Sequence, residues 1–127
     1  MIEFSEYIGI PFVAGGRDRR GCDCWGLLRL IYKERLGVDL PAYTGYDHPL
    51  GDDAAALIQE GRTEWEGVDS PEPMDAVLFK VGGRPNHIGL VVVPGLMIHS
   101  AAGKDSCIES YSRPLWRSRI EGFYRAR

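Results

Sequence analysis

The sequence encodes one capped helix ahead of all its clear strand candidates, and this order limits the folds open to the 127-residue chain. Asp23 is a suitable N-cap, an apolar face follows it, and Gly37 stands where a helix C-terminus is usually closed. The helix is therefore predicted to span Cys24 to Leu36. The later strand candidates are separated by Pro and Gly turns and cover residues 76–79, 87–93, 96–100, 106–111 and 120–125. This pattern predicts an α+β fold in which the helix packs on one face of an antiparallel sheet.

The remaining segments add shorter elements. Apolar residues from Glu3 to Val13 have the spacing of a short helix, and a polar loop is expected from Gly15 to Arg20. Residues 41–73 are rich in turn formers, with one expected short helix from Asp53 to Glu60, and are interpreted as a covering segment. Residues 1–127 are therefore expected to form a single domain.

Charge and hydropathy argue against several classes of function. The formal net charge is -3, so no general attraction to nucleic acid or to an anionic membrane is expected. Apolar runs are too short to cross a bilayer, and the first residues lack the basic start and apolar core of a signal peptide. The chain has three cysteines, two of them separated by a single residue. This pattern suits free thiols better than a disulfide framework. We expect a protein that is made in a bacterial cytoplasm without a signal peptide and is not inserted in a membrane.

Cys24 is the candidate nucleophile because it stands at the predicted helix start. Unpaired N–H groups and the positive end of the helix dipole favour a thiolate there, so we expect a lowered pKa for Cys24. The same amides could receive the oxyanion of a tetrahedral intermediate. The alternative is that Cys24 is only a small buried hydrophobic residue. Two later histidines on strand-like segments favour the catalytic interpretation.

His87 and His99 are the candidate base and its orienting partner. His87 opens a predicted strand, and Gly89 on the same face is expected to leave room for the start of the helix. His87 could instead be a turn residue that faces solvent. His99 shares the face of His87 if the connecting loop has an odd number of residues or the ribbon carries a bulge, and it could then hydrogen bond the distal nitrogen of His87. Otherwise His99 is a satisfied, half-buried histidine.

Several motifs together resemble the NlpC-type cell-wall peptidases in order and approximate spacing. They cover nearly the whole chain and comprise Tyr7 to Gly16, Gly21 to Leu27, Leu40-Pro41, Met74 to Phe79, His87 to Val91, and Met97 to His99. The run from Arg17 to Gly26, with a C-terminal end rich in aromatic and Arg residues, looks most like the small members associated with bacteriophage tail tips.

This resemblance implies a papain-like α+β fold and a Cys24, His87, His99 triad. It also implies hydrolysis of an amide in peptidoglycan stem peptides, commonly the bond between γ-D-glutamate and diaminopimelate. The implied partners are a peptidoglycan peptide as substrate and the proteins of a phage tail or a related particle at the cell wall. No cofactor and no metal are expected.

The resemblance also places substrate-binding residues beside the nucleophile, namely Phe12, Asp23 and Trp25. The family often has Tyr at the position of Phe12, where its hydroxyl lies near the nucleophile and the substrate, and Phe12 can offer only a ring face. Trp25 replaces the commoner Ser. These two changes bear on how a free amino end of a stem peptide would be recognised.

Two alternatives come from other classes of protein. Cys22, Cys24, His87 and His99 supply the ligand types of a tetrahedral zinc site, although Cys-x-Cys is tighter than the usual spacing. The chain could also be a catalytically weak or inactive structural component of a tail-tip assembly that keeps the fold. Intact Cys24, His87 and His99 argue against that second alternative, whereas Phe12 keeps it open.

Overall fold

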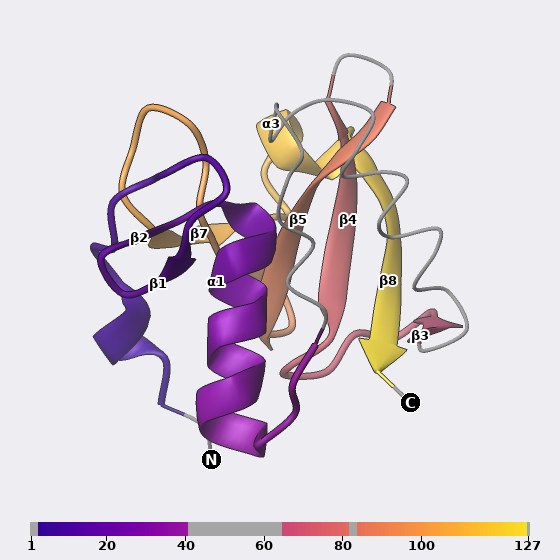
Figure 1. Cartoon of the computed structure of the whole chain (residues 1–127). Coiled ribbons are helices and arrows are strands. Elements are labelled where there is room, and N and C mark those ends of the chain that lie inside the picture. The colour runs from indigo at the N-terminus through magenta and orange to yellow at the C-terminus, as the bar shows by residue number, and fades with distance from the viewer. Residues whose placement is uncertain (1–2, 41–64, 82–83, 127) are drawn as a thin grey trace.

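The computed structural model describes residues 3–40, 65–81 and 84–126 and confirms the α+β class (Figure 1). A six-stranded antiparallel sheet has the order β3-β8-β4-β5-β6-β7, and a separate two-stranded ribbon joins β1 to β2. The strands of the large sheet are β3 (Trp65–Val68), β4 (Ala76–Val81), β5 (Arg84–Val93), β6 (Leu96–His99), β7 (Cys107–Ser110) and β8 (Ile120–Ala126). The described residues contain no helix long and apolar enough to cross a membrane.

The predicted helix from Cys24 to Leu36 is confirmed as two consecutive parts. The α-helix α1 (Cys24–Ile31) continues directly into the π-helical turn η2 (Tyr32–Leu36). Asp23 caps the start because its carboxylate accepts the backbone N–H of Gly26 at 2.8 Å. Gly37 ends the helix with φ at 67°, the left-handed conformation that glycine adopts without steric cost.

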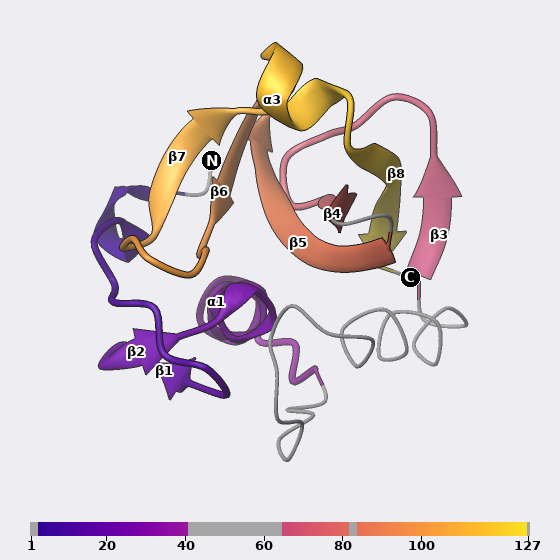
Figure 2. The same ribbon diagram turned by 90° about the horizontal axis from the view of Figure 1, so that it is seen from above.

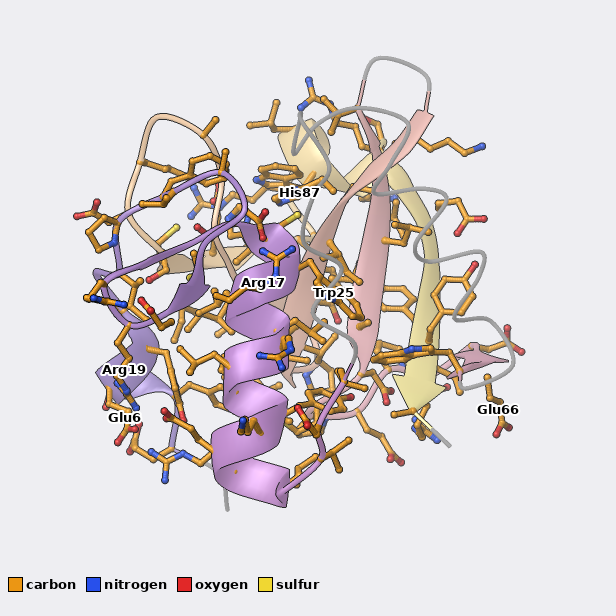
Figure 3. The ribbon with its side chains drawn as sticks, viewed as in Figure 1. Glu6, Arg17, Arg19, Trp25, Glu66 and His87 are labelled. Carbon is orange, nitrogen blue, oxygen red and sulfur yellow. The ribbon has the colours of Figure 1, made fainter. Side chains whose placement is uncertain are left out.

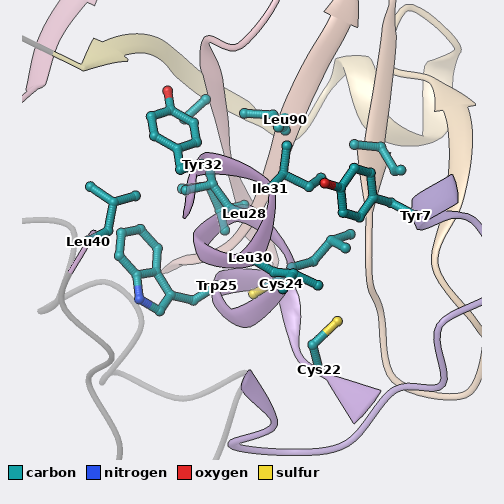
Figure 4. Packing of buried hydrophobic residues seen from close by; sticks show 14 of the residues in the cluster. Tyr7, Cys22, Cys24, Trp25, Leu28, Leu30, Ile31, Tyr32, Leu40 and Leu90 are labelled. Carbon is teal, nitrogen blue, oxygen red and sulfur yellow. The ribbon is translucent and has the colours of Figure 1, made fainter. Parts of the chain in front are cut away.

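The large sheet carries a hydrophobic cluster on each face. Figure 2 shows α1 on one side of this sheet. On one face, α1 packs against alternate residues of β5 and β6, including Ile88, Leu90 and Ile98. On the opposite face lies a second cluster under the short helix α3 (Pro114–Arg117), made by Val77, Phe79, Val91, Met97, Tyr111 and Trp116. Figure 4 shows the first cluster around α1. The strands β5 and β6 are therefore covered on both sides.

Two expectations for the N-terminal part are wrong. Only Ser5–Tyr7 form a helical turn, the 3-10 turn η1, and the rest of the segment from Glu3 to Val13 is not helical. Gly9 has φ at 90°, and residues 9 and 10 exchange backbone hydrogen bonds with Ser106. The segment lies against the loop before β7 and buries Tyr7 and Ile10, whereas Ile8 and Val13 are exposed. The expected polar loop from Gly15 to Arg20 contains the strand β1 (Arg17–Asp18), which pairs with β2 (Gly21–Cys22) directly after the loop.

The later elements differ from the sequence prediction mainly at their ends. The strand that holds His87 begins three residues earlier, at Arg84, so the interpretation of His87 as an exposed turn residue is wrong. The strand β3 and the helix α3 were not predicted. The short helix expected from Asp53 to Glu60 lies outside the described residues.

Candidate active site

The segment before the nucleophile is packed against the first turn of α1 through glycines. A Cβ atom on Gly26 would stand 2.1 Å from the carbonyl oxygen of Gly16, and one on Gly16 would stand 2.4 Å from the carbonyl oxygen of Gly21. These positions accept no side chain because backbone would have to move. Phe12 pairs with Cys22 in an isolated parallel bridge, with Val13 N to Cys22 O at 3.2 Å. The chain on both sides of β2 is thereby held beside the nucleophile.

Asp23 is fully buried, and its carboxylate is bonded to its own chain. One oxygen accepts from the backbone N–H of Gly26 and from Arg17 Nη1, each at 2.8 Å, and the other accepts from the N–H of Gly15 at 3.0 Å. Arg17 is also largely buried, and it donates to the carbonyl oxygen of Gly16 at 2.8 Å. Asp23 therefore ties the preceding loop to the helix start. Whether it also binds substrate stays a prediction.

Cys24 lies at the point where β6 leaves the sheet. The N–H of Val91 donates to Asp75 on the β4 side, so by alternation the N–H of Ile88 points to the β6 side. There β6 has already ended at His99, and the backbone amide of Ile88 hydrogen bonds to the Cys24 sulfur. Figure 3 shows His87, the residue before Ile88, at the end of the molecule where α1 begins.

The expected lowering of the Cys24 pKa is wrong. Burial is the largest effect, followed by the Asp23 carboxylate, and together they raise the pKa of Cys24 to about 11. The amides of Ile88 and Trp25 and the guanidinium of Arg17 oppose this, as the helix start predicts, but they are outweighed. Cys24 is only 5% exposed, so loss of hydration destabilises the thiolate by more than these contacts stabilise it. The resting group is a thiol.

A β-bulge places His99 on the same face of the sheet as His87. A bulge was one of the two conditions under which the sequence predicted a shared face. Next to the turn Val93 pairs with Leu96, and continuing that register would place His99 opposite Leu90, on the α1 face. The register shifts between Val91 and Val93, so that Leu90 pairs with Ile98 instead. The rings then meet, with His87 Nε2 and His99 Nδ1 2.9 Å apart.

His87 is 2% exposed and stands among aromatic rings on the α3 face of the sheet. Trp116 of α3 stacks on it with ring centroids 5.4 Å apart and planes at 25°, and Phe79 lies at 5.8 Å. Burial first, and then the neighbouring His99, lower the pKa of His87 to about 3. Since Nε2 is bonded to His99, Nδ1 is the ring nitrogen of His87 that this contact leaves available.

Glu109 on β7 extends this hydrogen-bonded chain and was missed in the sequence. Its Oε1 lies 2.8 Å from His99 Nε2 and accepts from Lys104 Nζ at 2.9 Å, while Oε2 accepts from Trp116 Nε1 at 2.8 Å. Burial by itself would raise the pKa of Glu109, but these hydrogen bonds outweigh it and lower the pKa to about 2. The β6–β7 register, in which Cys107 pairs with His99, places Glu109 on the face of His99, and the sequence alone does not reveal that register.

Gly89 does not make room for the start of the helix, although the sequence predicted this, and Trp25 lies in the core. A Cβ on Gly89 would stand 2.9 Å from Met97 Sδ and 3.5 Å from His99 Cβ, so Gly89 makes room on the histidine face and not for the helix. Trp25 is 7% exposed and belongs to the core. Figure 4 shows its ring directed toward Leu40, on the side of α1 away from Cys22. Whether Phe12 and Trp25 bind substrate stays a prediction.

The four-ligand metal site considered from the sequence is not assembled. Among the described residues, the one group of three or more His, Cys, Asp or Glu ligand atoms that lie together is His99, Cys107 and Glu109, within 4.8 Å of one another. Cys22, Cys24 and His87 are not part of it. In that group His99 and Glu109 are hydrogen bonded to each other, and the Lys104 ammonium is bonded to Glu109.

Residues 9–125 match the family model described as the NlpC/P60 family. The chain belongs to the NlpC/P60 family. Its fold is shared with the crystal structure of the NlpC/p60 domain of the peptidoglycan hydrolase SagA, with a TM-score of 0.67 at 24% identity over 97% of this chain and 92% of that one.

Curated relatives of this NlpC/P60 chain carry names of murein peptidases and of a γ-DL-glutamyl hydrolase. The murein DD-endopeptidase MepS/murein LD-carboxypeptidase of Escherichia coli is 23% identical over 94% of this chain and 57% of its own length. The γ-DL-glutamyl hydrolase of Bacillus subtilis is 26% identical over 97% of this chain and 28% of its own. The chain thus spans little more than half of the first of these relatives.

Proposed function

We propose that this NlpC/P60 chain is a cysteine peptidase that hydrolyses an amide bond in bacterial peptidoglycan stem peptides. Cys24 is the nucleophile, His87 the general base and acid, and His99 the residue that orients His87. One arrangement carries the proposal. The amide of Ile88 bonds to the Cys24 sulfur, and the preceding residue, His87, is hydrogen bonded through its distal nitrogen to His99.

The reaction begins from a neutral pair. His87 Nδ1 takes the proton of the Cys24 thiol as the sulfur attacks the scissile carbonyl carbon, and the oxyanion forms near the N–H groups of the first turn of α1. His87 then gives the proton to the leaving amine, and the C–N bond breaks to leave a thioester on Cys24. Water, deprotonated by His87, attacks the thioester and releases the new carboxylate and the thiol.

Burial explains why the pair rests uncharged. It raises the pKa of Cys24 to about 11 and lowers that of His87 to about 3, so neither charged form is favoured alone. Proton transfer therefore accompanies attack and does not precede it. The Ile88 and Trp25 amides and the nearby Arg17 favour the anionic sulfur once charge develops.

The bond we propose is the one between γ-D-glutamate and diaminopimelate. It rests on the family resemblance of the sequence motifs, and the name of the B. subtilis relative as a γ-DL-glutamyl hydrolase is consistent with it. The E. coli relative is named for DD and LD bonds, so the products must be identified directly.

The setting we propose is a phage tail or phage-like particle that opens the cell wall, assembled from protein made in the bacterial cytoplasm. Its support is the sequence form from Arg17 to Gly26. Co-purification of the chain with tail particles from a host that carries both would support this setting, and its recovery only outside particles would contradict it.

Digestion of purified peptidoglycan tests the proposed activity. The intact chain should release peptides with a new N-terminal diaminopimelate, identified by mass spectrometry, and Cys24→Ala should release none. Cys22→Ala is the matched control for loss of a buried thiol and should retain activity, because the hydrogen bonds of Cys22 with Pro11, Val13 and Ser100 are made by its backbone. Absence of cleavage by the folded intact chain on several wall types would favour the structural-component alternative.

A further inference from the structure

We propose that Glu109 is a positioning residue that sets the tautomers of both active-site histidines and so leaves His87 able to act as a base. This inference deepens the proposed peptidase function and rests on it. It starts from an unbroken chain of contacts, from His87 Nε2 to His99 Nδ1 at 2.9 Å and from His99 Nε2 to Glu109 Oε1 at 2.8 Å.

The contact between the two histidines does not by itself fix the direction of proton donation. A neutral imidazole has one N–H donor and one acceptor nitrogen, so either ring could donate to the other. If His99 donated from Nδ1, His87 would carry its proton on Nδ1, and that nitrogen could not accept the thiol proton in the proposed reaction. If His87 donates from Nε2, its Nδ1 has a free electron pair for that proton. The two arrangements differ only in tautomer.

Glu109 removes this ambiguity because an ionised carboxylate only accepts hydrogen bonds. Its lowered pKa keeps it ionised at neutral pH. His99 must then donate from Nε2, which leaves its Nδ1 as an acceptor. His87 must in turn donate from Nε2. Glu109 therefore determines the catalytic tautomer of His87 indirectly, through His99.

Three contacts hold Glu109 in place. Trp116 donates its indole N–H to Oε2 at 2.8 Å, and the same ring stacks on His87 and meets His99 edge-on at 5.1 Å. Lys104 donates to Oε1 at 2.9 Å. The Cys107 sulfur lies 3.8 Å from both Oε1 of Glu109 and Nε2 of His99. Trp116 thus links the carboxylate to the ring that it orients.

The test is nitrogen NMR of the imidazoles in the full chain, which contains only three histidines. Resonances are assigned from His87→Gln and His99→Gln variants. We expect Nε2–H tautomers for both His87 and His99 in the intact protein and in Lys104→Met, which removes a cation from the same carboxylate. In Glu109→Ala we expect the Nδ1–H form of His87 to appear, and kcat to fall at least about tenfold with little change in KM.

Glu109→Gln supplies the rescue, because its amide oxygen can still accept from His99 Nε2. It should restore the Nε2–H tautomers and most of kcat. Tautomers that do not change in folded Glu109→Ala would overturn the inference, whether or not the chain cleaves peptidoglycan. Expected tautomers in a chain without peptidase activity would overturn the proposed function and leave the role of Glu109 in the histidine pair intact.

Discussion

The nucleophile end and the histidine end of this active site are built in opposite ways. Around Cys24, most stabilising contacts come from neighbours in sequence: Asp23 caps the helix, Arg17 pairs with Asp23, and Gly16 fits against Gly26, while Ile88 of β5 is the exception. Around His87, the contacts come from β4, β6 and α3, with partners as distant as Trp116. The first end depends on local geometry, and the second depends on strand register.

The difference also concerns charge. The nucleophile end contains a buried ion pair and backbone amides that point at the sulfur. The histidine end is aromatic, and its carboxylate is separated from His87 by His99. Local charges therefore favour the developing thiolate, while the charge that supports the base acts through an intervening ring. Apart from Cys24 itself, we expect substitutions at the nucleophile end to lower stability. Substitutions at the histidine end should lower the catalytic rate.

Apart from removal of the Cys24 nucleophile itself, the largest effect is expected at the histidine end. His87→Ala removes the group that accepts the thiol proton and protonates the leaving amine, so turnover should fall at least about 10²-fold with the fold intact. His99→Ala should cost less because the base remains. His99→Asn should retain more activity than His99→Ala, since its amide oxygen can accept from His87. Steady-state hydrolysis of a stem peptide, with circular dichroism for folding, measures this. Equal loss in both His99 variants would show that orientation is not the role of His99.

At the nucleophile end, Asp23→Ala should lower the free energy of unfolding by about 3 kcal/mol, because it removes a helix cap and leaves Arg17 buried without its carboxylate. Asp18→Ala is the matched control. It breaks an exposed pair with Arg20 and should leave the free energy of unfolding almost unchanged. Urea unfolding of both variants compares them. A similar small cost for the two would contradict the structural role assigned to Asp23.

These two ends also differ in how far the sequence predicts them. The helix cap at Asp23, the C-terminal Gly37 and the alternation around His87 are local signals, and each led to the observed element. Glu109 and Trp116 were missed because their contacts depend on the β6–β7 register and on a four-residue helix. The direction expected for the Cys24 pKa was wrong. The sequence predicts that a helix start lowers this pKa, but the degree of burial, which raises it, depends on packing from elsewhere in the chain.

A smaller effect is expected from acid. The pKa of His87 is about 3 in the folded protein and near its ordinary value of 6.5 when unfolded, so between these values the unfolded chain binds more protons. Stability is therefore present above about pH 6.5 and is lost as pH falls toward 3. The loss should be about 2 kcal/mol between pH 7 and pH 5. Urea unfolding at the two pH values measures it, and His87→Gln should reduce the difference. An unchanged pH dependence in that variant would contradict a buried neutral His87.

Alkylation of Cys24 by iodoacetamide across pH, mapped by peptide mass spectrometry, tests the neutral thiol–imidazole pair most directly. If burial keeps Cys24 protonated, the rate of labelling at Cys24 should rise steadily from pH 6 to pH 10, and loss of peptidase activity should follow labelling of Cys24 and not of Cys107. A rate that is already high and independent of pH between about 5 and 8 would reveal a preformed thiolate–imidazolium pair. Loss of activity without modification of Cys24 would contradict its role as the nucleophile.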